Sequence, residues 1–123
     1  MKTLKANIPS IKTFTVNENG EIFNYLGKKL NGKKNPSFPY LRSLDFLNLD
    51  KKRQVMTFGK IVWNTFYPEN MAQADEIVQV IDREAEHVFA LKNLRKITKT
   101  EKVKELNEIR FSKLKSKRDN KNA

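Results

Sequence analysis

The first half of the chain alternates polar and apolar positions in the manner of short antiparallel strands. Residues 12–16 alternate in this way, an Asn-Gly pair at 19–20 supplies a hairpin turn, and residues 21–26 can return as the second strand. Residues 40–49 and 54–58 offer two further strands, after a loop that two prolines interrupt. The pattern predicts a small antiparallel module built from hairpins.

The spacing of apolar residues changes in the segment that follows. One face of a short predicted helix carries four residues: Ile61, Val62, Thr65 and Phe66. Pro68 closes this helix. We expect Trp63, beside the same face, and the phenylalanines to pack in the core and not to stack on nucleic-acid bases, because they recur at strand and helix spacing.

The last part of the chain predicts strand, loop, strand and helix, in that order. Residues 76–81 and 93–98 are rich in β-branched side chains, and an irregular loop joins them. Either Thr98 or Thr100 can cap a helix in which apolar residues recur among lysines. The predicted fold class is α+β: a small antiparallel hairpin sheet, a short helix, a strand-loop-strand unit and a basic C-terminal helix.

Charge changes this picture more than overall composition does. The chain has 25 Lys and Arg residues against 14 Asp and Glu residues, a net charge of +11, and such a surplus attracts phosphate backbones, anionic membranes or acidic proteins. Between residues 66 and 91 the net charge is negative, because Arg83 is the one Lys or Arg residue in this segment. Its six acidic residues are Glu69, Asp75, Glu76, Asp82, Glu84 and Glu86. We expect this acidic segment to turn away from a polyanion.

Length and composition exclude several classes of protein. A chain of 123 residues with 38% hydrophobic residues has room for one modest core, which argues against wholesale disorder. No apolar run approaches the roughly 20 residues of a membrane span, and the N-terminus lacks the apolar stretch of a signal peptide. The chain has no cysteine, which excludes disulfides and Cys-based zinc sites. We therefore expect an intracellular protein without a membrane partner.

Four stretches, in this order, resemble the small HNH homing endonucleases of phages. Residues 14–24 are similar to a family signature close to "Tyr-x-Val-Ser-Asn-x-Gly-x-Val", and residues 57–68 end in the Ile-Val, Phe and Pro of "Val-His-Arg-Leu-Val-x-x-x-Phe-x-Pro". Residues 78–84 and 93–98 stand where the family has "Val-Asp-His-x-Asp-Gly-Asn" and "Asn-Leu-x-Trp-Val-Thr". The similarity extends from about residue 8 to residue 104.

The resemblance implies how the chain is organised. It predicts a single HNH-endonuclease-like domain at residues 1–110, with an N-terminal sheet module at 8–68 and a degenerate ββα-metal core at 76–110. Residues 111–123 form a basic tail. Asp82 and Asn93 are retained, and we expect their side chains to hold the intervening loop through hydrogen bonds to backbone groups.

The resemblance also shows where catalytic groups have been replaced. HNH cleavage needs a His base to activate water, and an Asp with a later Asn or His to hold a divalent cation. The resemblance places Gln79, Val80 and Lys102 at these positions, and the family's earlier His and Arg on Gly59 and Lys60. Valine cannot accept a proton, and an ammonium opposes cation binding. We predict no nuclease activity, no metal and no cofactor.

Two interpretations of the single histidine stay open. His87 has Asp82, Glu84 and Glu86 nearby in sequence, so a relocated metal site is one alternative. The other is a solvated loop whose acids lie on the surface or pair with basic neighbours.

The main predicted function is nucleic-acid binding. We expect DNA to be favoured over RNA and no small-molecule substrate. We expect duplex binding mainly through phosphate contacts, which salt weakens steeply. The candidate contact residues are Lys28, Lys29, Lys33, Lys34, Lys51, Lys52, Arg53, Lys60, Lys99, Lys102, Lys104, Arg110 and Lys113.

Two alternatives belong to other functional classes. A repurposed phage-type protein would bind a host protein or a ribonucleoprotein assembly such as a polymerase, ribosome or virion component. An active metal-dependent nuclease would use His87. In each case the expected compartment is the cytoplasm of a bacterial or phage-infected cell.

Overall fold

The N-terminal part of the molecule is a four-stranded antiparallel sheet. The computed structural model describes residues 2–36, 41–104 and 107. The strands pair in chain order: β1 (Thr3–Lys5), β2 (Thr15–Asn17), β3 (Ile22–Phe23) and β4 (Lys29–Leu30). The predicted hairpin at 12–26 is confirmed as β2 and β3, with Val16 opposite Ile22 and a left-handed Gly20 in the turn. β1 and β4 extend this hairpin on both sides.

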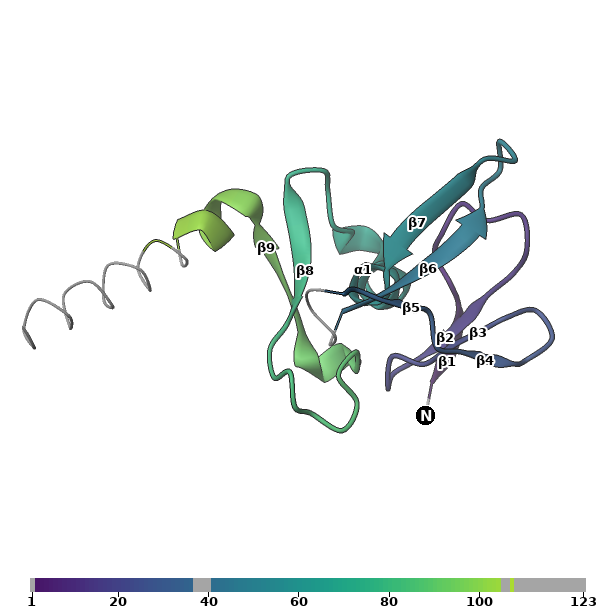
Figure 1. Cartoon of the computed structure of the whole chain (residues 1–123), viewed down its shortest axis with the longest axis horizontal. Coiled ribbons are helices and arrows are strands. Elements are labelled where there is room, and N and C mark those ends of the chain that lie inside the picture. Colours follow the sequence, from purple (N-terminus) through teal and green to yellow (C-terminus); the bar gives the residue numbers. More distant parts are fainter. Residues whose placement is uncertain (1, 37–40, 105–106, 108–123) are drawn as a thin grey trace, which may run out of the picture.

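A second antiparallel sheet contains the other two predicted strands. It consists of β5 (Lys33–Lys34), β6 (Arg42–Leu47) and β7 (Arg53–Thr57), with β6 in the middle. Asn48 shapes the turn between β6 and β7, because its Oδ1 accepts hydrogen bonds from the amides of Asp50 and Lys52 at 2.9 and 3.1 Å. The β6–β7 hairpin projects from the body of the molecule (Figure 1).

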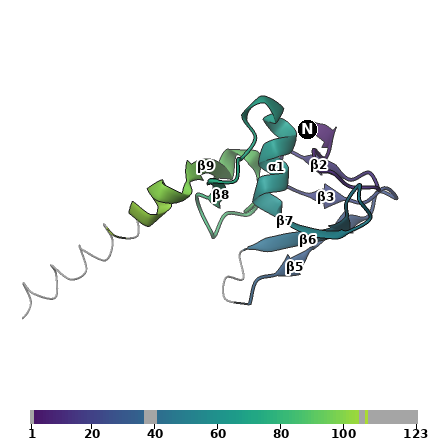
Figure 2. The ribbon, with the colours of Figure 1, turned by 90° about the horizontal axis from the view of Figure 1, so that it is seen from above.

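Helix α1 (Phe58–Phe66) follows β7 directly and lies at the centre of the molecule. Its residues Ile61 and Val62 are fully buried. The helix contacts β6 and β7 on one side and β8 (Glu76–Val80) on the other. Figure 2 shows it running lengthwise between the β8–β9 pair and the two sheets. The 3-10 turn η1 (Pro68–Asn70) ends this segment, as Pro68 predicts.

Trp63 lies on the flank of α1 instead of deep inside the molecule. Its ring is half-buried and its centroid is 4.6 Å from that of Tyr67. The indole Nε1 donates a hydrogen bond to the Asn70 carbonyl at 2.9 Å. The predicted structural role of Trp63 is therefore confirmed, because this ring packs on the core and ties the end of α1 to η1.

The predicted order of strand, loop, strand and helix is confirmed in the last part of the described chain. β8 pairs antiparallel with β9 (Leu94–Thr98), and the 3-10 turn η2 (Leu91–Asn93) precedes β9. Residues 99–104 are helical but exposed, with Val103 at 56% exposure. This helical stretch points away from the body (Figures 1 and 2). The helix that packs against β8 is α1.

One hydrophobic core joins the two sheets to the β8–β9 pair. The buried cluster includes Val16 of β2, Ile22 of β3, Phe46 of β6, Ile61 of α1 and Leu94 of β9. None of the helices in the described part of the chain is both long and apolar enough to cross a membrane. The predicted helix positions Leu106, Ile109 and Leu114 lie outside the described residues.

Candidate nucleic-acid interface

The positions that the resemblance assigns to catalysis lie at the C-terminal end of β8 and in the exposed helical stretch. Gln79 is paired with Arg95 across the strands, and its Oε1 accepts a hydrogen bond from Arg95 Nε at 2.9 Å. Val80 points to the other face and packs against the hydrophobic core. Lys102 is exposed in the helical stretch at 99–104.

This set of side chains does not fit the divalent cation that HNH cleavage requires. Mg²⁺ and related hard cations take carboxylate, carbonyl and water oxygens. Here Gln79 offers an amide oxygen that already accepts a hydrogen bond from Arg95, Val80 offers only a hydrocarbon side chain, and Lys102 offers an ammonium group. Across residues 2–36, 41–104 and 107, no three His, Asp or Glu side chains are grouped so that they could hold a metal.

The loop between β8 and β9 is held by hydrogen bonds from Asn93. The Asn93 Oδ1 accepts from the Asp82 amide at 3.0 Å, and its Nδ2 donates to the carbonyls of Asp82 and Val88 at 2.9 and 2.8 Å. Asp82 Oδ1 in turn accepts from the Glu84 amide at 3.0 Å. The structural role predicted for Asp82 and Asn93 is confirmed by this arrangement.

The same loop is docked on the turn of the β2–β3 hairpin. The Leu91 amide donates to the Glu18 carbonyl at 2.9 Å. Gly20 lies so close to Phe89 that a Cβ atom on Gly20 would be 2.1 Å from the Phe89 carbonyl oxygen. Two segments about 70 residues apart in sequence thus form one surface.

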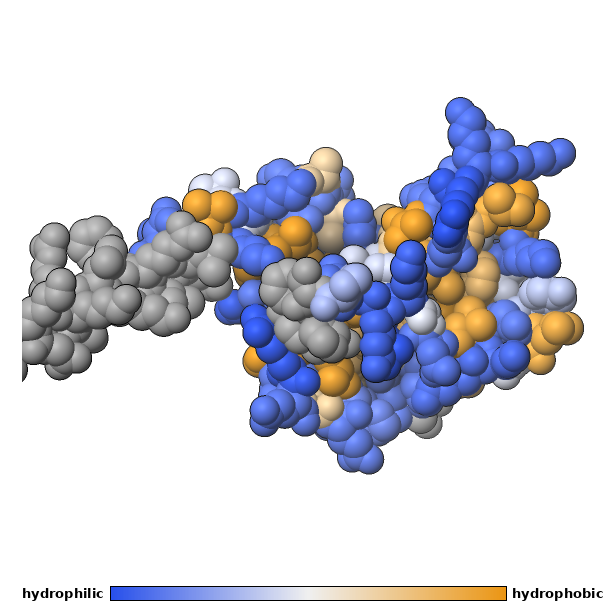
Figure 3. Space-filling view, viewed as in Figure 1, coloured by the Kyte–Doolittle hydropathy of each residue, from blue (hydrophilic) through white to orange (hydrophobic). Residues whose placement is uncertain are grey.

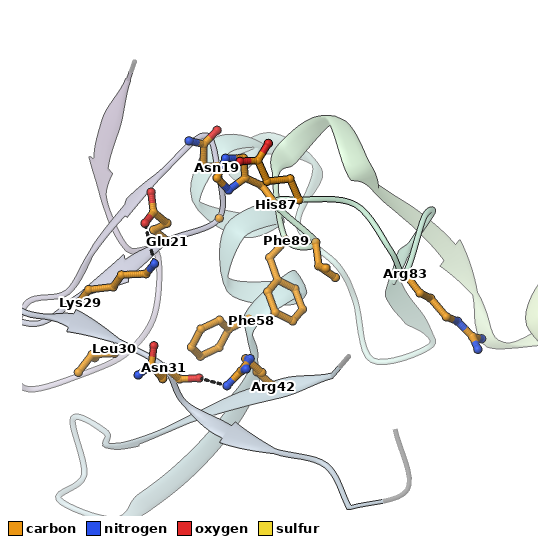
Figure 4. A pocket seen from close by; sticks show the side chains of 13 residues that line it. Asn19, Glu21, Lys29, Leu30, Asn31, Arg42, Phe58, Arg83, His87 and Phe89 are labelled. Carbon is orange, nitrogen blue, oxygen red and sulfur yellow. Dashed lines mark hydrogen bonds and ion pairs between the residues drawn. The ribbon is translucent and has the colours of Figure 1, made fainter. Parts of the chain in front are cut away.

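His87 lies in this docked part of the loop, and its side chain is exposed. It lies beside Asn19, in the turn of the hairpin that carries Glu21 (Figure 4). The Lys29 Nζ is 2.9 Å from Glu21 Oε2, and Asn17 Nδ2 donates to Glu21 Oε1 at 3.1 Å. These bonds, the one from Lys29 first, lower the pKa of Glu21 below its ordinary value.

The predicted phosphate contacts occupy several separate elements. Lys28 and Lys29 lie at the start of β4, and Lys33 and Lys34 make up β5. Lys51 and Lys52 form the tip of the β6–β7 hairpin, and Arg53 begins β7. The other described candidates are Lys60 in α1 and Lys99, Lys102 and Lys104 in the helical stretch. Arg110 and Lys113 lie outside the described residues.

These cations are not equivalent, because two of them have carboxylate partners. Lys29 pairs with Glu21, and Arg53 pairs with Asp45 across the β6–β7 hairpin. Lys60 is half-buried on α1, whereas Lys51 and Lys52 are exposed at the hairpin tip. Figure 3 shows hydrophilic side chains over β5 and the hairpin, with hydrophobic patches between them on the hairpin.

The acidic segment predicted from the sequence is divided in the structure. The strand β8 separates Asp75 and Glu76 at one end from Asp82, Glu84 and Glu86 at the other. The Glu76 carboxylate pairs with the Lys96 ammonium at 3.3 Å. Glu86 lines a cleft whose lining also includes Lys29 of β4. Strand β8 thus separates the acids into two groups, and the expectation that this segment turns away from a polyanion stays a prediction.

An apolar groove lies on the outer side of β6. Ile11, Phe14, Phe46 and Leu47 line it, with a volume of about 380 Å³. Ile11 and Leu47 are half-exposed there, and Leu49 near the hairpin tip is 69% exposed. The groove was not predicted from the sequence, which assigned its Phe14 and Phe46 to the core.

A solved structure with a similar fold is that of the HNH homing endonuclease I-HmuI, described as binding and cleaving DNA. The two chains share 14% sequence identity at a TM-score of 0.62, and the match covers 88% of this chain. This chain spans 59% of the length of the endonuclease chain. No protein-family model and no curated protein matches the sequence. The structural similarity establishes an HNH-like α+β fold.

Proposed function

We propose that this protein binds duplex DNA through phosphate contacts and does not cleave it. The fold, shared with an enzyme described as binding and cleaving DNA, supports nucleic acid as the ligand. The net charge of +11 and the exposed lysines of the β6–β7 hairpin support binding to the phosphate backbone. The proposal includes a phage origin, on the family resemblance of the sequence.

We infer the loss of cleavage chiefly from the contacts that Gln79 and its neighbour make. The Gln79 amide is used in a hydrogen bond to Arg95, and its neighbour Val80 packs into the core. Neither side chain can activate water or bind a metal from these positions. The HNH-like fold is kept, while Gln79 makes a hydrogen bond to Arg95 and Val80 packs in the core. A protein of this kind is suited to binding DNA without cleaving it.

The test is a titration of fluorescent duplex DNA, single-stranded DNA and RNA across a series of salt concentrations. We expect tightest binding to the duplex and a steep loss of affinity with salt, because each neutralised phosphate releases condensed counterion. Plasmid with Mg²⁺ or Mn²⁺ should stay intact. Weak binding to all three polymers would overturn the DNA proposal, and metal-dependent nicking would overturn the loss of cleavage.

Removing charge at the hairpin tip should change the salt dependence. The double variant Lys51→Ala, Lys52→Ala should reduce the slope of log affinity against log salt by about two, if both lysines contact phosphate. Lys2→Ala, Lys5→Ala removes the same charge from exposed positions outside the predicted set. Equal effects of the two double variants would show that only net charge matters.

The apolar groove favours a second candidate, binding to a protein or ribonucleoprotein. Half-exposed Ile11 and Leu47 with Lys12 at the rim would suit an amphipathic acidic segment of a host protein. Copurification of a protein in place of nucleic acid would favour this candidate. A third candidate, a nuclease centred on His87, requires nicking activity that His87→Ala abolishes.

A further inference from the structure

A cleft opens between the β2–β3 hairpin, β4 and the loop that joins β8 to β9 (Figure 4). Its volume is about 360 Å³, within the range of small-molecule sites, which begins at ~300 Å³. The cleft exists because the loop is docked on the hairpin turn through Gly20 and the bond from Leu91 to Glu18. Its walls therefore come from segments that the fold holds in fixed relation.

The inner wall of the cleft is aromatic. The rings of Phe58 and Phe89 lie with their centroids 5.5 Å apart and their planes at 60°. Phe58 is buried, whereas Phe89 is half-buried, so Phe89 is the ring that a ligand can reach. An aromatic surface at the bottom of a polar cleft is suited to stacking against a flat ring.

The rim of the cleft carries hydrogen-bond donors and acceptors together. Arg42 Nη1 donates to the Asn31 carbonyl at 2.9 Å, which holds the guanidinium beside the cleft. Arginine has five N–H donors, so this one bond leaves donors for a ligand. Glu21 and Glu86 supply carboxylate acceptors, and Asn19 supplies an amide. His87 completes the rim next to Asn19 (Figure 4).

This mixture favours a nucleobase over a phosphate group. The lining carries three cations, Lys29, Arg42 and Arg83, and two carboxylates, Glu21 and Glu86, with Lys29 paired to Glu21 at 2.9 Å, so its formal charge is only +1 and attracts a phosphate weakly. A base edge presents N–H donors and lone-pair acceptors side by side, and its face stacks on aromatic rings. The rim and the Phe89 ring offer partners for both features.

We infer that this cleft binds a single unpaired nucleobase, by stacking on Phe89 and by hydrogen bonds to Arg42 and the rim carboxylates. The inference rests on the proposed function, because it requires nucleic acid to reach this surface. It adds a preference for a base outside the helical stack, which phosphate contacts alone do not provide.

The test compares two fluorescent duplexes that differ by one extrahelical nucleotide. We expect the wild-type protein to bind the duplex with the extrahelical base about tenfold more tightly, a factor typical of one stacked base. Arg42→Ala should reduce this preference, because it removes hydrogen-bond donors of the rim and leaves the Phe89 ring in place. Lys28→Ala takes the same charge from an exposed turn outside the cleft, so it should weaken binding to both duplexes equally and preserve the ratio.

A second measurement covers the case in which Arg42→Ala does not fold. In the wild-type protein, the extrahelical base should shift the NMR signals of the amides at 19–21 and 86–89, and the paired duplex should not. Equal affinity for both duplexes, with steep salt dependence, would overturn the cleft inference and leave DNA binding intact. Binding to neither duplex would overturn the proposed function itself.

Discussion

Asn93 and Gly20 show how single residues fix the loop between β8 and β9. Asn93 provides three hydrogen bonds from one buried amide, and Gly20 allows the hairpin turn to touch Phe89. The Asn93 bonds join positions 5 to 11 residues apart, whereas the contact of Gly20 with Phe89 joins segments about 70 residues apart. The geometry of the cleft therefore depends on a few residues that do not face a ligand.

Gly20 and Gly27 form a matched pair for testing this close approach. Both have left-handed backbones, with φ of 79° and 80°, but an added Cβ meets Phe89 only at Gly20 and open space at Gly27. We expect Gly27→Ala to lower the free energy of unfolding by about 1 to 2 kcal/mol, the cost of the left-handed conformation. Gly20→Ala should cost at least about 2 kcal/mol more, because overpacking adds to that strain.

Urea denaturation of both variants measures this difference directly. Equal losses would mean that the loop moves away from the hairpin without cost, and the docking of the two segments would then be weak.

The sequence predicted some of these residues and not others, for a physical reason. The Asp82–Asn93 bonds were predictable because the family resemblance marks both residues and Asn and Asp favour local backbone bonds. Arg42 was missed, since nothing in its own segment indicates that its guanidinium reaches the Asn31 carbonyl. A cleft assembled from distant segments has no local pattern.

At the scale of elements, the predictable ones had strong local signals. The Asn-Gly pair at 19–20 marked the β2–β3 turn, and Pro68 marked the end of α1. β4 and β5 contain two residues each and pair through tertiary context, so no periodicity identifies them. Phe58, predicted as the end of a strand, begins α1 because β7 passes into the helix without a loop.

The start of the helical stretch after β9 can be tested by its cap. Thr98 Oγ1 accepts a hydrogen bond from the Glu101 amide at 3.1 Å, which selects Thr98 from the two predicted caps. Thr98→Ala should destabilise this helical turn by about 1 kcal/mol. Thr100→Ala, at an exposed position inside the turn, should have little effect.

Amide hydrogen exchange at Glu101 reports the stability of this turn. Faster exchange in Thr98→Ala than in Thr100→Ala is the expected result, and the reverse order would assign the cap to Thr100.

At the scale of the whole molecule, ion pairs make stability depend on pH. The pKa values of Glu21, Asp45 and Glu76 are lowered, chiefly by hydrogen bonds from Lys29, from Arg53 and from the Gln73 backbone, respectively. A carboxyl group with a lowered pKa binds fewer protons in the folded state than in the unfolded state. Its stabilisation is present above the unfolded pKa and is lost as pH falls through the folded pKa.

We therefore expect the free energy of unfolding to fall between about pH 5 and about pH 2. Glu21→Gln should reduce this dependence, because it removes one of the three groups. Glu18→Gln, which removes an exposed carboxyl from the same hairpin, is the matched control. Urea midpoints across this pH range measure the effect, and an unchanged pH profile in Glu21→Gln would contradict it.

Because α1 lies at the centre of the molecule, neither the N-terminal half nor the C-terminal half can bury its apolar residues without the other. Ile61 and Val62 are fully buried, and the helix that carries them contacts β2, β6 and β8. A chain cut between Ala74 and Asp75 would leave two pieces, each exposing to water the apolar surface that the other covers. We expect such pieces to behave as complementary fragments, which regain their shape by association and not separately.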